Sequence, residues 1–220
     1  FEEILYRHLY NPTKDLRQAQ IPYTNIYALY GILLVELRRL EDAREALKKG
    51  LQWNPVHFEI MSEYVETFKI EGNMEEFYEK TIKLFQIAIH APEVAWCFRN
   101  LGYYFVEKEL YHEAAAAYLL STKYDNESKQ AQSELYYINK MTGGIKDPTF
   151  EEIVGYAEKY GFPTGADGAI LYIAYTYGKH FLEQGEKEAA RYFLGILYEL
   201  TQDEQVKEML SPDYSPEDKA

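Results

Sequence analysis

The sequence predicts an all-helical solenoid in which antiparallel helix pairs stack one after another. Three observations support this fold class. Apolar and small residues recur three and four positions apart, which is the spacing of one helix face. The pattern returns at intervals of 34 to 37 residues, as expected of a repeat protein. Only 13 Gly and 8 Pro occur among 220 residues, which suits helices joined by short turns better than a sheet protein.

The first helix pair is predicted at about 24–57. Two stripes at helical spacing flank a turn around Arg38 and Arg39, and Asn54-Pro55 ends the second helix. Proline has this effect because it disfavours helical geometry in the residue before it. The first stripe consists of Tyr27, Tyr30, Gly31 and Leu34, and the second of Leu40, Ala43, Leu47 and Leu51.

Further pairs are predicted at about 58–91, 95–128 and 171–204. Val65, Gly102 and Gly178 take the place of Gly31, at steps of 34, 37 and 76 residues. The last step leaves room for one irregular repeat. A small residue at this place lets two helix backbones approach closely. The second pair has Val65 there and Phe77 opposite, so its helices are expected to lie farther apart.

The irregular repeat is predicted at 129–165. Its helices are expected at 128–141 and 149–160, with a link between them that is longer than in the other pairs. The register of the first helix stays open, because both Leu135 and Ile138 suit the core position.

These residues resemble the tetratricopeptide repeat (TPR) family, as found in bacterial proteins of unassigned role. The family pattern has an aromatic residue, Leu-Gly and Tyr on the first helix, then Ala, an aromatic residue or Leu, and a closing Pro on the second. The resemblance implies a right-handed superhelix whose first helices line a concave surface. It rests on Tyr27, Tyr30-Gly31, Ala43, Leu47 and Pro55, on Leu101-Gly102, Phe105, Ala114 and Tyr118, and on Tyr177-Gly178, Phe181 and Ala190.

A single repeat domain is predicted over 1–210. Residues 1–12 end in Leu9-Tyr10-Asn11-Pro12, much like Gln52-Trp53-Asn54-Pro55. They are either the second helix of a truncated repeat or an ordinary amphipathic helix. A short capping helix is expected at 203–210, and a disordered acidic tail at 211–220.

The formal net charge of −13 argues against nucleic acid as a partner, because no basic stripe is present to displace counterions from phosphates. The longest apolar stretch, 169–177, is too short to insert into a membrane. The lone Cys97 forms no internal disulfide. The cytoplasm is the expected compartment, although a signal or anchor upstream of Phe1 would change this.

The sequence predicts no enzyme. His8, His57, His90, His112 and His180 lack partners at metal-ligand spacing, so neither a metal nor a cofactor is expected. Cys97 has only Arg99 nearby to lower its pKa, and a buried packing role is the better interpretation. Phosphate-binding loops and nucleophile elbows are absent from the sequence. Paired acids at predicted helix starts are explained by the helix dipole.

A concave binding groove is the site that the resemblance implies. The clamp of Lys, Asn and Arg with which some members hold acidic chaperone tails is absent, since its places carry Ala28, Ile32, Glu63, Trp96 and Asn100. Exposed aromatic and Arg side chains are typical interface hot spots. The predicted contacts on the face left over by the core stripes are Trp96, Arg99, Tyr103, Tyr136, Tyr172, Tyr175 and Lys179.

The leading functional interpretation is a non-enzymatic module that binds a peptide or helix of a partner protein in this groove. One alternative is a structural spacer or self-association domain of a larger protein, which would make the chain a homo-oligomer. Another alternative is a small-molecule sensor or regulatory domain.

Overall fold

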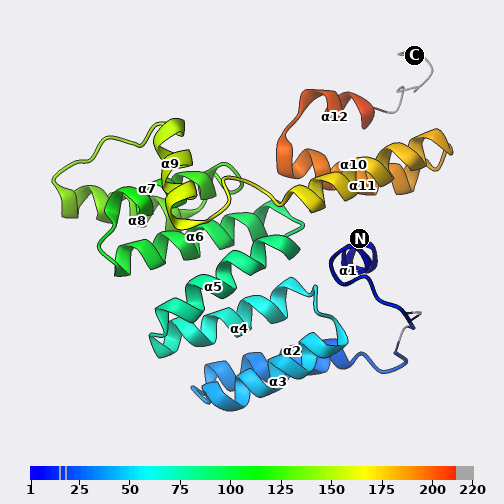
Figure 1. Cartoon of the computed structure of the whole chain (residues 1–220), viewed down its shortest axis with the longest axis horizontal. Coiled ribbons are helices and arrows are strands. Elements are labelled where there is room, and N and C mark those ends of the chain that lie inside the picture. Colours follow the sequence, from blue (N-terminus) through cyan, green and yellow to red (C-terminus); the bar gives the residue numbers. More distant parts are fainter. Residues whose placement is uncertain (15, 18, 212–220) are drawn as a thin grey trace.

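The chain is all-helical in the computed structural model, which describes residues 1–14, 16, 17 and 19–211 (Figure 1). No strand occurs in these residues. The helices are α1 (Glu2–Tyr10), α2 (Tyr23–Glu36), α3 (Leu40–Trp53), α4 (Phe58–Glu71), α5 (Met74–Leu84), the 3₁₀-helix η1 (Phe85–Ile87), α6 (Ala91–Glu107), α7 (Tyr111–Thr122), α8 (Lys129–Thr142), α9 (Phe150–Tyr160), α10 (Gly168–Glu183), α11 (Lys187–Thr201) and α12 (Glu204–Met209).

Four helix pairs account for most of the packing: α2 with α3, α4 with α5, α6 with α7, and α10 with α11. The first three pairs stack in sequence order, because α3 also contacts α4 and α5 contacts α6. Helix α7 then contacts α8. The predicted all-α solenoid is therefore confirmed.

Small residues lie where the two helices of a pair cross, as the sequence predicted. A Cβ atom built on Gly102 would lie 2.6 Å from the ring of Tyr118, and one built on Gly178 would lie 2.7 Å from Leu194. Gly31 is similarly overlaid by Leu47. Each glycine therefore provides room for a large side chain of the opposite helix. Helices α4 and α5, which lack such a glycine, share less backbone contact than the other three pairs.

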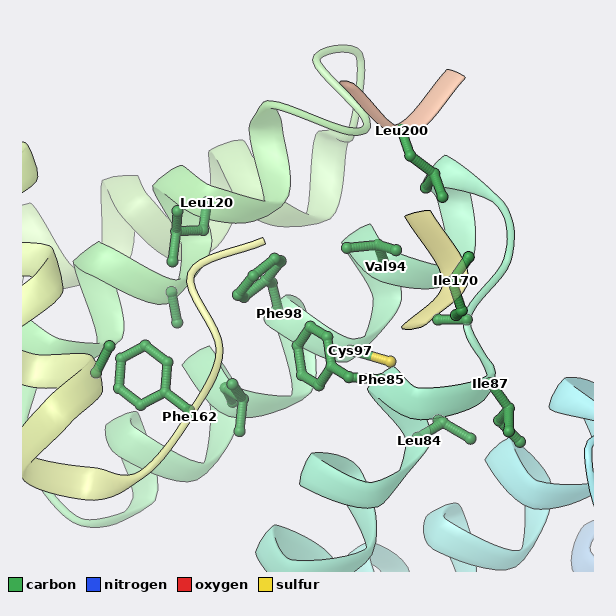
Figure 2. Packing of buried hydrophobic residues seen from close by; sticks show 14 of the residues in the cluster. Leu84, Phe85, Ile87, Val94, Cys97, Phe98, Leu120, Phe162, Ile170 and Leu200 are labelled. Atoms are coloured by element: carbon green, nitrogen blue, oxygen red, sulfur yellow. The ribbon is translucent and has the colours of Figure 1, made fainter. Parts of the chain in front are cut away.

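The buried apolar residues form two clusters. One lies within α2–α5 and includes Leu34, Leu47, Ile60 and Phe77. The larger one extends from the end of α5 to α12 and includes Leu5 of α1. Figure 2 shows its centre, where η1 and α6 meet the start of α10 and the end of α11; the labelled residues there include Phe85, Ile87, Val94, Cys97, Phe98, Ile170 and Leu200.

Helix α9 packs on α7 rather than forming a close pair with α8. The main-chain oxygen of Tyr160 accepts a hydrogen bond from the hydroxyl of Tyr78 at 2.9 Å, and the Tyr160 hydroxyl donates one to Glu113 at 3.1 Å. These contacts hold the end of α9 against α5 and α7. On α8, Ile138 is fully buried while Leu135 is only partly buried, which decides the register that the sequence left open.

The last pair, α10 and α11, packs on α1 and η1 (Figure 1). The rings of Phe1 and Phe193 are 5.7 Å apart, and Leu5 is fully buried. Asn54 donates a hydrogen bond to Glu2 at 2.8 Å. Helix α1 therefore lies between the last pair and the end of α3. The second helix of a preceding repeat would instead pack along α2.

Helix α12 lies in the place expected for a capping helix. The Asp203 side chain accepts a hydrogen bond from the main-chain N–H of Gln205 at its start, and Val206 is buried against α11. The acidic tail expected at 211–220 lies, beyond Ser211, outside the described residues. None of the described helices combines the length and apolar character needed to cross a membrane.

Candidate binding groove

A pocket of about 280 Å³ opens between the first helices of three successive repeats. On each of these helices, residues three and four apart face the same way. The pocket is polar at its edges and has one large aromatic side chain. Its lining residues are Ser62, Glu63, Glu66 and Lys69 on α4, Trp96, Arg99 and Asn100 on α6, and Gln130 on α8.

Arg99 and Asn100 contribute nitrogen donors to the wall of this pocket. Nη1 of Arg99 donates to Oδ2 of Asp125 at 3.0 Å, and the Arg99 side chain is only 12% exposed. Nε of Arg99 and Nδ2 of Asn100 are buried without an acceptor among the described residues. An unpaired buried donor costs about 1–3 kcal/mol, so an acceptor that reached either group would stabilise the site.

Carboxylates line the α4 side of the pocket. Burial raises the pKa of Glu63, and the nearby carboxylates of Glu66, Glu59 and Glu36 add to this shift. Lys69 balances part of the charge, because its Nζ lies 3.4 Å from Oε2 of Glu66. The pocket therefore offers both donors and acceptors, and an acidic ligand would meet repulsion from α4.

Aromatic rings flank the polar groups. Trp96 lies edge-on to Phe58, with ring centroids 6.0 Å apart. One helical turn beyond Arg99, Tyr103 lies edge-on to Phe77 at 6.0 Å, and Nζ of Lys69 lies 4.8 Å from the centre of the Tyr103 ring. A cation over a ring in this way is an attractive contact. Tyr103 and Lys69 therefore form one continuous wall on this side of the pocket.

The seven residues predicted for the groove fall into three places. Trp96 and Arg99 line the pocket, and Tyr103 lies beside it through Lys69. Tyr136 is 73% exposed on α8 and lines a smaller hollow, of about 190 Å³, formed with α7 and the link that follows α8. The other three, Tyr172, Tyr175 and Lys179, lie exposed on α10, which packs on α1 and η1 instead of following α8.

The pocket is also lined by residues that were not among the predicted contacts: Ser62, Glu63, Glu66, Lys69, Asn100 and Gln130. The repeat pattern of the sequence could have identified two of these residues. Glu63 and Asn100 occupy the same repeat position, one residue before Tyr64 and Leu101 of the core stripes. The side chain at this position lies at the border between core and groove.

No group of three His, Cys, Asp or Glu within 1–14, 16, 17 and 19–211 is placed to hold a metal ion. Burial raises the pKa of the Cys97 thiol well above its ordinary value, which keeps the thiol protonated.

Comparison with known proteins identifies a fold but no closer relative. No family model matches the chain, and the curated proteins contain no match. Among solved structures, a chain of the APC/C hetero-tetramer Cut9–Hcn1 aligns over 95% of this chain and 39% of its own length, with 14% identity and a TM-score of 0.51. PilF of Pseudomonas aeruginosa aligns over 85% and 81%, with 16% identity and a TM-score of 0.48. YrrB, a TPR protein with an unusual peptide-binding site, aligns over 94% and 96%, with 16% identity and a TM-score of 0.45.

At these identities the likeness concerns the fold alone. Together with the repeat of 34 to 37 residues and the glycines at the helix crossings, it makes this a TPR-like fold.

Proposed function

We propose that the chain is a non-enzymatic protein-interaction module that binds an extended peptide of a partner protein in the pocket between α4, α6 and α8. The observation that carries the proposal is the pair of buried donors without acceptors, Nε of Arg99 and Nδ2 of Asn100, in the wall of a pocket that also holds Trp96.

Main-chain carbonyl oxygens of a peptide are suitable acceptors for these two donors. The carboxylates of Glu63 and Glu66 would accept from peptide N–H groups in turn, while Trp96 covers an apolar side chain. A peptide rich in Asp and Glu is disfavoured, since α4 already holds several carboxylates close together. A neutral or basic segment with one large apolar residue fits the pocket best.

Selection from a displayed peptide library on the whole chain, followed by calorimetric titration of the selected peptides, tests this proposal. Trp96→Ala is expected to weaken binding at least about tenfold, as removal of a central aromatic anchor does. Arg99→Ala is expected to weaken binding as well, with a fall in stability because Asp125 loses its partner. Circular dichroism checks that both variants stay helical.

Tyr175→Ala on α10 is the matched control, because it removes an exposed aromatic ring of similar size away from the pocket. Unchanged affinity in this variant supports the pocket as the site. If Trp96→Ala binds the selected peptides as tightly as the unmodified chain, the pocket between α4 and α6 is not the binding site.

A further inference from the structure

The outer face of α2 carries an apolar stripe that nothing covers in the part of the chain that the structure describes. It consists of Ile26, Leu29, Tyr30, Leu33 and Leu37, which we call the α2 stripe. These five residues are between 50% and 67% exposed. Their spacing of three and four places them along about three turns of one helix face.

The corresponding faces of α4 and α6 are covered by a neighbouring helix. Ile60, at the position of Ile26, is fully buried below Gly50 of α3. Tyr104, at the position of Leu33, lies with its ring centre 4.4 Å from that of Tyr78 on α5. The α2 stripe therefore has the shape and chemistry of a surface that receives a helix.

Helix α1 does not supply that cover, because its own apolar side is already used. Leu5 is fully buried, and Phe1 packs on Phe193 of α11. Helix α2 is also nearly free of charge, since Glu36 is its only residue with a formal charge. A helix that is apolar on all sides is normally buried.

We propose that a second copy of this chain covers the α2 stripe, through an antiparallel pairing of two α2 helices about a two-fold axis. Charge favours this place of contact. Each copy carries a formal charge of −13, so two copies repel each other over most of their surface, whereas the α2 stripe itself is uncharged.

The exposed area is also of the size that a dimer needs. Trp53 (53% exposed) and Ile21 (48% exposed) lie near the start of α2 and extend the stripe. Seven large side chains that are each about half exposed offer an area of the order of the ~800 Å² that one partner of a standard interface buries.

A closed pair is favoured over an open chain of copies. In a head-to-tail assembly the α2 stripe would pack on α11 of the next copy, in continuation of the repeat order. Helix α12 already packs on α11, with Val206 buried between them. The matching apolar surface that a second copy can offer is therefore its own α2 stripe, and an isologous pairing closes at two.

In the antiparallel pairing, Tyr30 and Leu33 lie at the middle of the α2 stripe, and Tyr30 of one copy meets Leu33 of the other. Ile26 meets the region of Leu37 in the other copy. A charged side chain introduced at the centre of the α2 stripe would be present in both copies, and both charges would lose their water when the pair forms. Charged substitutions at the centre are therefore expected to disrupt the pair most.

Sedimentation equilibrium of the whole chain over a range of concentrations tests this proposal. The expected mass is 51.6 kDa, twice the 25.8 kDa of one copy. Replacing both Leu29 and Leu33 by Glu is expected to raise the dissociation constant of the dimer at least 100-fold without loss of helicity, because both side chains are exposed in the single copy. Tyr136→Glu, which places a charge on the exposed face of α8, is the control and should leave the dimer intact.

Cysteine cross-linking tests the arrangement. A chain that carries both Tyr30→Cys and Leu33→Cys is expected to form a disulfide-linked dimer on oxidation, because position 30 of one copy faces position 33 of the other. Tyr172→Cys is not expected to do so, and the native Cys97 is buried and does not interfere. The proposal is overturned if the chain is a monomer throughout, which would leave a helix of another protein as the occupant. It is also overturned if the dimer forms but the double Glu variant does not weaken it and the double Cys variant does not cross-link it.

Discussion

The pairs α2–α3, α4–α5 and α6–α7 stack in the order of the sequence, whereas the pair α10–α11 leaves that line and packs on α1 and η1. Internally the two regions are alike. Gly102 lies below Tyr118 in the stacked region, and Gly178 lies below Leu194 in the last pair. A helix pair is therefore defined by residues close in the sequence, whereas its position depends on surfaces that are distant in the sequence.

The chain leaves the line of stacked pairs at α9, and Phe105 joins α9 to these pairs. The ring of Phe105 lies 5.2 Å from that of Tyr160 and 5.6 Å from that of Phe162. Phe105→Ala is expected to lower the free energy of unfolding by about 3–5 kcal/mol, the largest effect considered, because it opens a cavity at this junction. Urea unfolding followed by circular dichroism measures the loss.

Phe150→Ala is the matched control at the exposed start of α9. Its ring contacts Lys123 at 5.3 Å, and its removal should cost less than about 1 kcal/mol. Equal losses in the two variants would mean that Phe105 does not connect the two regions.

The likeness of the pairs is tested at their crossing points. Gly102→Ala and Gly178→Ala should each cost about 1–3 kcal/mol, because the added methyl group overlaps Tyr118 or Leu194. Gly155→Ala on α9 meets no neighbouring atom within 4 Å and should stabilise the chain by about 0.5–1 kcal/mol. Thermal unfolding gives all three values. A cost at Gly102 with none at Gly178 would contradict the claim that the two regions share one internal design.

The position of the last pair is tested at Glu199. Its Oε1 accepts a hydrogen bond of 2.7 Å from the main-chain N–H of Ala91, at the start of α6, and its Oε2 lies 3.1 Å from Nδ1 of His90. Glu199→Gln is expected to cost about 1 kcal/mol. Hydrogen exchange should become faster in α10 and α11 and stay unchanged in α2 and α3. Faster exchange throughout the chain would show that the contact does not act locally.

The smallest expected effect concerns the groove. The pKa of Glu63 is raised in the folded chain, so the unfolded chain releases this proton at lower pH. Stability is therefore lost as the pH rises from the ordinary Glu value of about 4.3 toward the raised pKa. Glu63→Gln should be slightly more stable than the unmodified chain at pH 7, by no more than roughly 0.5 kcal/mol because solvent screens the partly exposed carboxyl group, and should lose this advantage in acid. Urea titrations at the two pH values measure the difference. The prediction is contradicted if the stability of Glu63→Gln, measured relative to the unmodified chain, is lower at pH 7 than in acid.

The amino-acid sequence alone is enough to predict the helix pairs. A glycine or alanine at a helix crossing, with a large residue opposite, can be recognised from the local spacing of residues. Asn54-Pro55 likewise marked the end of α3 at Trp53. It also determined that Trp96 and Arg99 share a face, because three residues separate them on one helix.

The places of α1, α9 and the pair α10–α11 could be learned from the folded chain but not from the spacing of residues. Their positions depend on contacts between residues far apart in the sequence, such as Phe1 with Phe193 and Tyr78 with Tyr160. A hydrophobic period shows that a helix has an apolar side, but it does not show which surface will cover that side. For this reason the spacing could not reveal that Tyr172, Tyr175 and Lys179 lie on a helix that leaves the line of the groove, or that Tyr30 remains half exposed on α2.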